Sequence, residues 1–222
     1  MKSPLRKRIP RELKGEFGKY LVVFLLMVLT IGFVSGFLVA DGSMLKAYDE
    51  SFDKYNIENG NFRTAEKVYR SQWKDIEAAG VTLYENYYIE EALDNGSTMR
   101  FFKNREQVNK VCLMKGEMPS EQGEIAIDRM YADNNSLQVG DTLTGGKKSW
   151  KIIGLVALSD YSALFQNNND SMFDSVKFGV GIVTPEEFET LDQEKLQYNY
   201  AWIYDQQPVD EKEEKEVSED LM

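Results

Sequence analysis

The chain has 222 residues with 26 basic and 37 acidic side chains, a net charge of -11, no histidine and one cysteine. The missing histidine excludes Ser-His-Asp and Cys-His catalytic triads and histidine metal ligands, and a single cysteine excludes an internal disulfide. The charge is also unevenly divided, because residues 1–19 carry seven basic and two acidic groups, whereas the remainder is strongly acidic and would repel nucleic acid.

The basic segment, residues 1–19, precedes a long apolar run. Within it Leu5, Ile9, Leu13 and Phe17 recur every four residues, with basic groups between them. This spacing predicts a short amphipathic helix on the cytoplasmic face of a membrane, where its cations meet anionic lipid. A solvated basic tail is the alternative interpretation.

Residues 20–40 contain no charged side chain. A helix of this length spans about 30 Å, the thickness of a bilayer hydrocarbon core, which excludes a simple soluble protein. The basic flank predicts a cytoplasmic N-terminus and an extracytoplasmic main domain. The run exceeds the usual core of a cleaved signal peptide, so we expect a retained transmembrane helix. Gly32 and Gly36 form a G-x-x-x-G pair, a pattern that allows another helix to approach closely.

A helical stalk is predicted over residues 41–60. Met44, Leu45, Tyr48 and Phe52 have helical spacing, so the membrane helix is expected to continue outward.

Residues 61–204 are predicted to form a mixed α+β extracytoplasmic domain, because short helices alternate with strands and hairpins. The chain from 205 to 222 is expected to be an acidic tail or linker. The expected elements of the domain are a helix at 64–79, a strand at 81–93, a turn at 94–97, strands at 98–103 and 124–127, a helical turn at 128–134, strands at 142–144 and 150–158 around a turn at 145–148, a strand at 178–184 leading into a helix capped by Thr184 with Pro185 in its first position, and a strand at 198–204.

No catalytic, cofactor-binding or metal-binding residue is assigned from the sequence. Cys112 is expected to be a small buried apolar residue. The run 167–170 is rich in oxygen ligands but lacks the spacing of a calcium loop, so an exposed polar loop is expected. The segment 144–148 lacks Walker A spacing, so the chain is not expected to hydrolyse ATP itself. Cross-strand packing is expected for a cluster of aromatic residues, Tyr84, Tyr87, Tyr88, Phe101 and Phe102.

A series of short motifs runs through the predicted domain, consisting of Lys115–Pro119, Gly123–Ile127, Ala132, Leu137–Leu143 and Lys151–Val156. In its order and spacing this series resembles the extracytoplasmic core domain of MacB/FtsX-type ABC transporter permeases. The basic leader followed by one membrane helix and a large outer domain is also similar to that family, so the resemblance covers nearly the whole chain.

The resemblance implies a non-catalytic permease portion in the cell membrane, which couples ATP hydrolysis by a partner to movement of an outer domain. The implied partners are a cytoplasmic ABC ATPase subunit, other permease helices or a second permease copy, and membrane lipid. Such permeases have at least three further membrane helices after the outer domain, so this chain is expected to be an N-terminal part. The alternative is a single-pass surface receptor or binding protein whose acidic domain binds a cationic partner. A membrane-anchored hydrolase with carboxylate or Ser-Lys chemistry is the third possibility.

Overall fold

The computed structural model describes residues 14–161, 163–167, 169–208 and 215, with only the backbone described at residues 41 and 43. It divides into two compact units, residues 1–50 and residues 51–222. The second is called the globular unit below. Most of the predicted amphipathic leader and most of the acidic tail lie outside the described residues.

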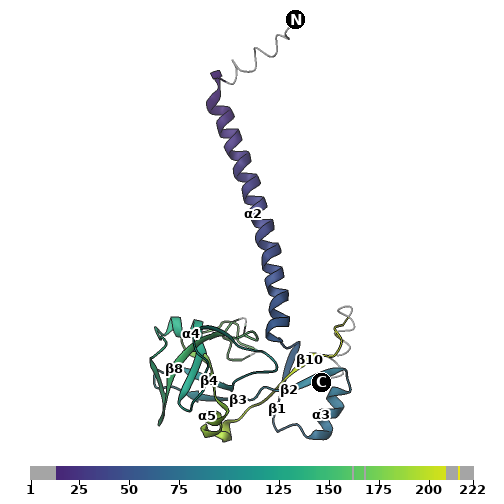
Figure 1. Ribbon diagram of the computed structural model, residues 1–222, viewed down its shortest axis with the longest axis vertical. Helices are drawn as coiled ribbons and strands as arrows, with labels where there is room; N and C mark the ends of the chain where they lie inside the picture. Colours follow the sequence, from purple (N-terminus) through teal and green to yellow (C-terminus); the bar gives the residue numbers. More distant parts are fainter. Residues whose placement is uncertain (1–13, 162, 168, 209–214, 216–222) are drawn as a thin grey trace. The chain divides into compact units, whose positions relative to one another are not determined.

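Helix α2 runs without interruption from Phe17 to Tyr55 and contains the uncharged run (Figure 1). Its apolar side chains are exposed, as Phe33 and Phe37 are at 77% and 69%, and its most apolar stretch has the length and composition of a membrane span. The expected apolar helix is therefore confirmed as a candidate span. The helix ends at Tyr55, where Asn56 adopts a φ of 48°, so residues 56–60 of the predicted stalk are not helical.

A small antiparallel sheet forms one part of the globular unit. Its strand order is β1-β10-β2, with β1 at Gly60–Thr64, β10 at Tyr198–Tyr204 and β2 at Val81–Glu85. Helix α3, Arg70–Glu77, packs its Trp73 against Tyr200, with the two ring centroids 5.7 Å apart. The predicted helix at 64–79 was therefore too long, and its first residue belongs to the unpredicted strand β1.

The predicted single strand at 81–93 is wrong, because it is two strands in two sheets. β2 belongs to the small sheet, whereas β3, Tyr88–Ala92, is an edge strand of the large sheet. Between them the N–H of Asn86 donates to the carbonyl of Asn199 at 2.9 Å. Only Glu85 and Asn86 interrupt the apolar residues at this crossing, and each half contributes to a separate core, so the sequence was interpreted as one strand.

The large sheet has the order β3-β4-β9-β6-β8-β5, with β7 paired to β8. The pairs β4–β9 and β6–β8 are parallel and the others are antiparallel, which confirms the mixed α+β class. The remaining elements are β4 at Thr98–Lys103, β5 at Cys112–Gly116, β6 at Glu124–Asp128, α4 at Arg129–Asn134, β7 at Thr142–Gly145, β8 at Lys148–Ala157, β9 at Phe178–Val183, α5 at Pro185–Thr190 and a 3-10 turn at Gln193–Lys195.

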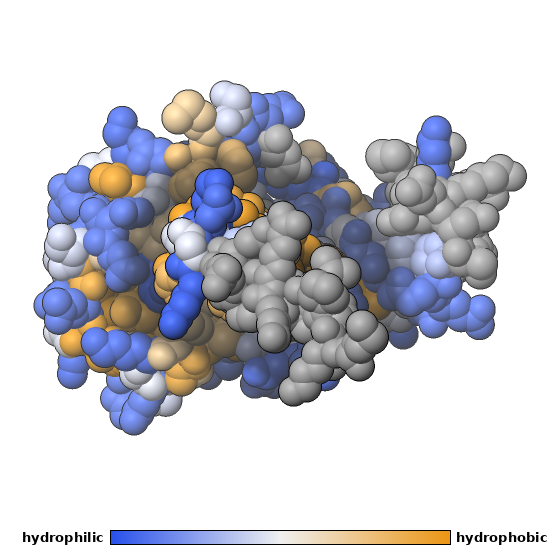
Figure 2. All heavy atoms as spheres, turned by 90° about the horizontal axis from the view of Figure 1, so that it is seen from above, coloured by the Kyte–Doolittle hydropathy of each residue, from blue (hydrophilic) through white to orange (hydrophobic). Residues whose placement is uncertain are grey.

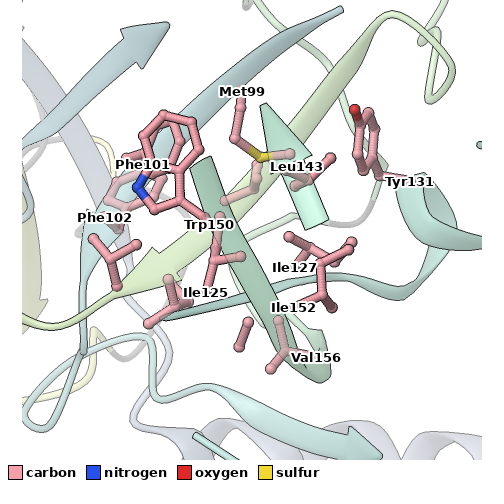
Figure 3. Close-up of a cluster of buried hydrophobic side chains, with 14 of the residues drawn as sticks. Met99, Phe101, Phe102, Ile125, Ile127, Tyr131, Leu143, Trp150, Ile152 and Val156 are labelled. Atoms are coloured by element: carbon pink, nitrogen blue, oxygen red, sulfur yellow. The ribbon is translucent and has the colours of Figure 1, made fainter. Parts of the chain in front are cut away.

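The core of the large sheet is built from buried apolar side chains of these strands, and β9 is buried at every position (Figure 3). Ile125, Ile127 and Ile152 are completely buried, and the rings of Phe101 and Trp150 lie 4.8 Å apart between centroids. The indole N–H of Trp150 donates to Glu187 at 2.9 Å, so its single polar atom is satisfied inside the core.

Several local predictions are confirmed by the backbone geometry. The turn at 94–97 joins β3 to β4, with Gly96 at a φ of 81°. The turn between β7 and β8 has Gly145 paired to Lys148. Thr184 accepts a hydrogen bond from the N–H of Glu187 at 3.2 Å and caps α5 as expected. The sequence did not predict β5.

Candidate functional site

A pocket of about 470 Å³ is lined by residues from both sheets of the globular unit. The small sheet contributes Phe62 and Arg63 from β1, and the large sheet contributes Tyr88 from β3 and Arg100 from β4. The small sheet also contributes Asn61 from β1 and Asn199 from β10, and Asn86 lies between β2 and β3. Further lining residues include Glu58, which follows α2, and four residues that follow β8, namely Asp160, Tyr161, Phe165 and Gln166.

Arg100 is fixed in this pocket by charge-assisted hydrogen bonds. Its Nε and Nη2 donate to Oε1 of Glu90 at 2.9 and 2.6 Å, and its Nη1 donates to the hydroxyl of Tyr161 at 2.8 Å. The guanidinium lies 4.2 Å from the ring centroid of Tyr88. The charge of Arg100 is therefore neutralised by Glu90, and its position is held by an aromatic face.

Glu58 lies just after α2 and is held by two amide side chains. Asn61 donates to its Oε1 at 2.6 Å, and Asn109 donates to its Oε2 at 2.5 Å. Asn109 also accepts from the backbone N–H of Glu58 at 2.9 Å. Burial, followed by the negative charge of Asp160, raises the pKa of Glu58 to about 7, against the lowering effects of both amides and Arg105.

An ion pair between Arg105 and Asp160 connects this pocket to a second one. Nη1 of Arg105 donates to Oδ2 of Asp160 at 2.6 Å, and the two side chains are only 5% and 6% exposed. Asp160 lines the first pocket, whereas Arg105 lines a neighbouring pocket of about 430 Å³. Nε and Nη2 of Arg105 and Oδ1 of Asp160 are buried without a hydrogen-bond partner in the described part of the chain.

Among the described residues, no three His, Cys, Asp or Glu side chains are placed to hold a metal ion. The sequence did not predict this pocket, because its hydrogen bonds join residues far apart in the chain. Asn109 and Glu58, for example, are separated by 51 positions.

Pro119 of the motif series lines the second pocket, whereas Gly116 and Gly154 of the series lie outside both pockets, at backbone contacts of the large sheet. Gly116 ends β5 with a φ of 78°, and a Cβ at this position would lie 2.1 Å from the carbonyl oxygen of Ile153. A Cβ at Gly154 would lie 2.2 Å from the carbonyl oxygen of Glu117. Both glycines are required by the close approach of β5 and β8.

The second motif turn joins α4 to β7. The N–H of Gly140, at a φ of 104°, donates to the carbonyl of Ile152 at 2.8 Å, and the N–H of Ile152 donates to the carbonyl of Asp141 at 2.9 Å. The carboxylate of Asp141 accepts from the N–H of Gln138 at 2.8 Å. These motif residues therefore fix the turn and its register.

The structure separates the aromatic cluster that the sequence grouped together. Tyr88 and Phe102 face each other across β3 and β4 with ring centroids 5.6 Å apart, which confirms cross-strand packing for this pair. Tyr87 instead packs in the small-sheet core, 5.3 Å from Tyr200 between centroids. Tyr84 lies on β2, and Phe101 packs on Trp150.

Two other predictions concern single sites. Cys112 was expected to be a buried apolar residue, but it is only half-buried, because it starts β5 at the border of the sheet. Asn167 and Asp170 form an exposed turn, in which the N–H of Asn167 donates to Oδ2 of Asp170 at 2.8 Å.

Figure 2 draws all heavy atoms coloured by hydropathy, and hydrophilic and hydrophobic side chains are interspersed where the grey atoms leave the face visible.

The chain is structurally similar to two extracytoplasmic domains. One is the periplasmic region of MacB from Actinobacillus actinomycetemcomitans, with 11% identity, a TM-score of 0.37 and coverage of 69% of this chain and 72% of that chain.

The other is the extracellular domain of the noncanonic ABC-type transporter YknZ from Gram-positive bacteria, with 11% identity, a TM-score of 0.38 and coverage of 71% of this chain and 86% of that chain. No family model and no curated protein sequence matches the chain.

Proposed function

We propose that this chain is the N-terminal part of an FtsX/MacB-like ABC transporter permease subunit, in which ATP hydrolysis by a partner moves an extracytoplasmic domain for export or mechanotransmission. The observation that carries the proposal is the motif series from Lys115 to Val156, whose glycines occupy positions with strict backbone requirements. The 21 uncharged residues of the membrane-length run support it.

The proposed organisation is a cytoplasmic basic segment at 1–19, a transmembrane helix at 20–40, a stalk that begins at 41, an outer domain through 204 and a linker from 205. Seven basic residues before the span support a cytoplasmic N-terminus. The localisation is therefore the cell membrane, with the main domain outside.

Mechanical coupling is supported by the length of α2. Its 39 residues measure about 58 Å at 1.5 Å per residue, against about 30 Å for the hydrocarbon core. A continuous helix longer than the membrane transmits a displacement from one side to the other because its backbone hydrogen bonds resist bending.

The proposed partners are a cytoplasmic ABC ATPase subunit, other permease helices or a second permease copy, and membrane lipid. The space around Gly32 and Gly36 is open, because a Cβ at either position would meet no atom within 4 Å. Small residues with this spacing allow close helix contacts, which supports a partner helix in the membrane. The chain itself is proposed to be non-catalytic.

Affinity purification of the complete protein from its native membranes, in mild detergent, tests the partnership. We expect a cytoplasmic ABC ATPase subunit to co-purify and to show vanadate-sensitive ATP hydrolysis. Purification of the complete protein without any such subunit would contradict the proposal and would favour a single-pass receptor.

A further inference from the structure

Two carboxylates of the first pocket remain incompletely compensated. Glu58 has no cation within ion-pair distance among the described residues, and its two hydrogen-bond donors are neutral amides. Asp160 is paired with Arg105, yet its Oδ1 is buried without a partner. Because Arg105 compensates only one of the two carboxylates, the group of three carries one net negative charge when Glu58 is ionised.

The other walls of the pocket suit an organic cation. Five aromatic side chains line it, and the face of an aromatic ring attracts a positive charge. Two of them, Tyr88 and Phe102, already hold the guanidinium groups of Arg100 and Arg105. The two basic side chains that line the pocket, Arg100 and Arg63, do not form an ion pair with Glu58 among the described residues. Arg100 is compensated by Glu90, and Arg63 is exposed, with its Nη1 bonded to the hydroxyl of Tyr88 at 2.6 Å. The aromatic residues are Phe62, Tyr88, Phe102, Tyr161 and Phe165.

Asn86 supplies an independent observation. It is only 5% exposed, it lines both pockets, and within the described residues its side-chain amide has no hydrogen-bond partner. The amide atoms of Asn86 are not among the fully enclosed unpartnered atoms, so a ligand or water in the pocket can reach and satisfy them. Its oxygen is an acceptor of the kind that an ammonium N–H requires.

We propose that this pocket binds the primary ammonium group of a small aliphatic amine, such as the side chain of a lysine or a free amine of similar size. Glu58 supplies the opposite charge, the aromatic residues surround the alkyl portion, and Asn86 accepts a hydrogen bond. The volume of about 470 Å³ lies within the range of small-molecule sites. An ammonium fits better than a metal ion, because the described residues contain no triad of metal-ligating side chains.

Binding at this pocket requires no ATPase and does not rest on the proposed transport function. Protons compete with the amine, because the pKa of Glu58 is about 7. The charged groups around Glu58 are Asp160, which favours its protonation, and Arg105, which opposes it. Amine binding is therefore stronger above neutral pH, where Glu58 is ionised.

The test is isothermal titration of the full chain, in nanodiscs of neutral phosphatidylcholine, with n-butylammonium and with uncharged 1-butanol as probes. We expect saturable binding of butylammonium at one site and no saturable binding of butanol. Affinity should fall about tenfold from about pH 8 to about pH 6, because the ionised fraction of Glu58 falls by that factor.

Two variants and one control locate the binding. Glu58→Gln, which preserves shape, should weaken butylammonium binding at least tenfold and remove its pH dependence, and Asn86→Ala should weaken it several-fold. Glu66→Gln, a change of an exposed carboxylate outside the pocket, should bind like the parent chain. Thermal unfolding verifies that each variant is folded. Equal binding of butanol, absence of saturable amine binding, or unchanged binding by folded Glu58→Gln would overturn the proposal.

Discussion

Nη1 of Arg105 and Oδ2 of Asp160 are joined at 2.6 Å in an ion pair that is almost completely removed from solvent. The guanidinium carbon of Arg105 also lies 3.9 Å from the ring centroid of Phe102. Breaking a buried pair on one side leaves the other charge uncompensated, and this cost exceeds that of losing an exposed pair.

Arg105→Met should therefore lower the free energy of unfolding by about 3 to 5 kcal/mol. The double variant Arg105→Met/Asp160→Leu should recover much of this loss, because both charges are then removed. Urea unfolding of the full chain in detergent measures both values. The control is Lys67→Met, which breaks the exposed 3.1 Å pair with Glu85 and should cost about 0 to 1 kcal/mol. Similar losses for the two single variants would contradict this interpretation.

Glu58 should make the stability of the chain depend on pH. Its pKa rises from 4.5 to about 7 on folding, so its favourable contribution is complete below pH 4.5 and is lost as the pH rises through about 7. The full effect is roughly 3 kcal/mol. The free energy of unfolding of the parent chain should be lower at about pH 8 than at about pH 5. This difference should disappear in Glu58→Gln and remain in Glu66→Gln. An identical pH dependence in Glu58→Gln would show that another group is responsible.

Gly116 and Gly123 form a matched pair for testing the contact between β5 and β8. Their φ values are 78° and 79°, but a Cβ would collide with Ile153 only at Gly116, whereas the space at Gly123 is open. Both alanine variants incur the cost of a left-handed backbone, so any difference reports the collision. Gly116→Ala should be less stable than Gly123→Ala by about 1 to 3 kcal/mol in thermal or urea unfolding. Equal losses would show that the strands separate without cost.

The membrane orientation can be tested with single cysteines in a Cys112→Ser background. Lys14 precedes the uncharged run and Glu66 follows it, and both side chains are exposed in the described structure. On intact cells, a membrane-impermeant maleimide should label the Glu66→Cys variant and should label the Lys14→Cys variant only after permeabilisation. Labelling in the reverse order would place the globular unit inside the cell.

Short-range patterns predicted much of the fold. The uncharged run indicated α2, Asp94–Ser97 indicated the hairpin between β3 and β4, and Thr184 followed by Pro185 indicated the start of α5. In each case the determining interaction lies within a few residues along the chain. The strand at 98–103 was predicted with its observed bounds for the same reason.

Strand β1 and the pocket could not be predicted from the sequence, because both depend on interactions between residues far apart in the chain. β1 is stabilised by pairing with β10, whose residues lie more than 130 positions away, as Thr64 and Tyr198 do. The pocket depends on similar distances, because Arg105 and Asp160 are 55 positions apart. Neither charged residue belongs to a recognisable motif, so only the folded chain brings them together.

The most direct test of the central claim is a fluorescence distance measurement on the complete protein with its ATPase partner in nanodiscs. A donor attached to the Glu66→Cys, Cys112→Ser variant would report distance to acceptors at the lipid surface. We expect different transfer efficiencies in the nucleotide-free and vanadate-trapped states, because in the proposed function ATP hydrolysis by the partner moves the outer domain. Identical efficiencies in the two states, with an active ATPase bound, would contradict it.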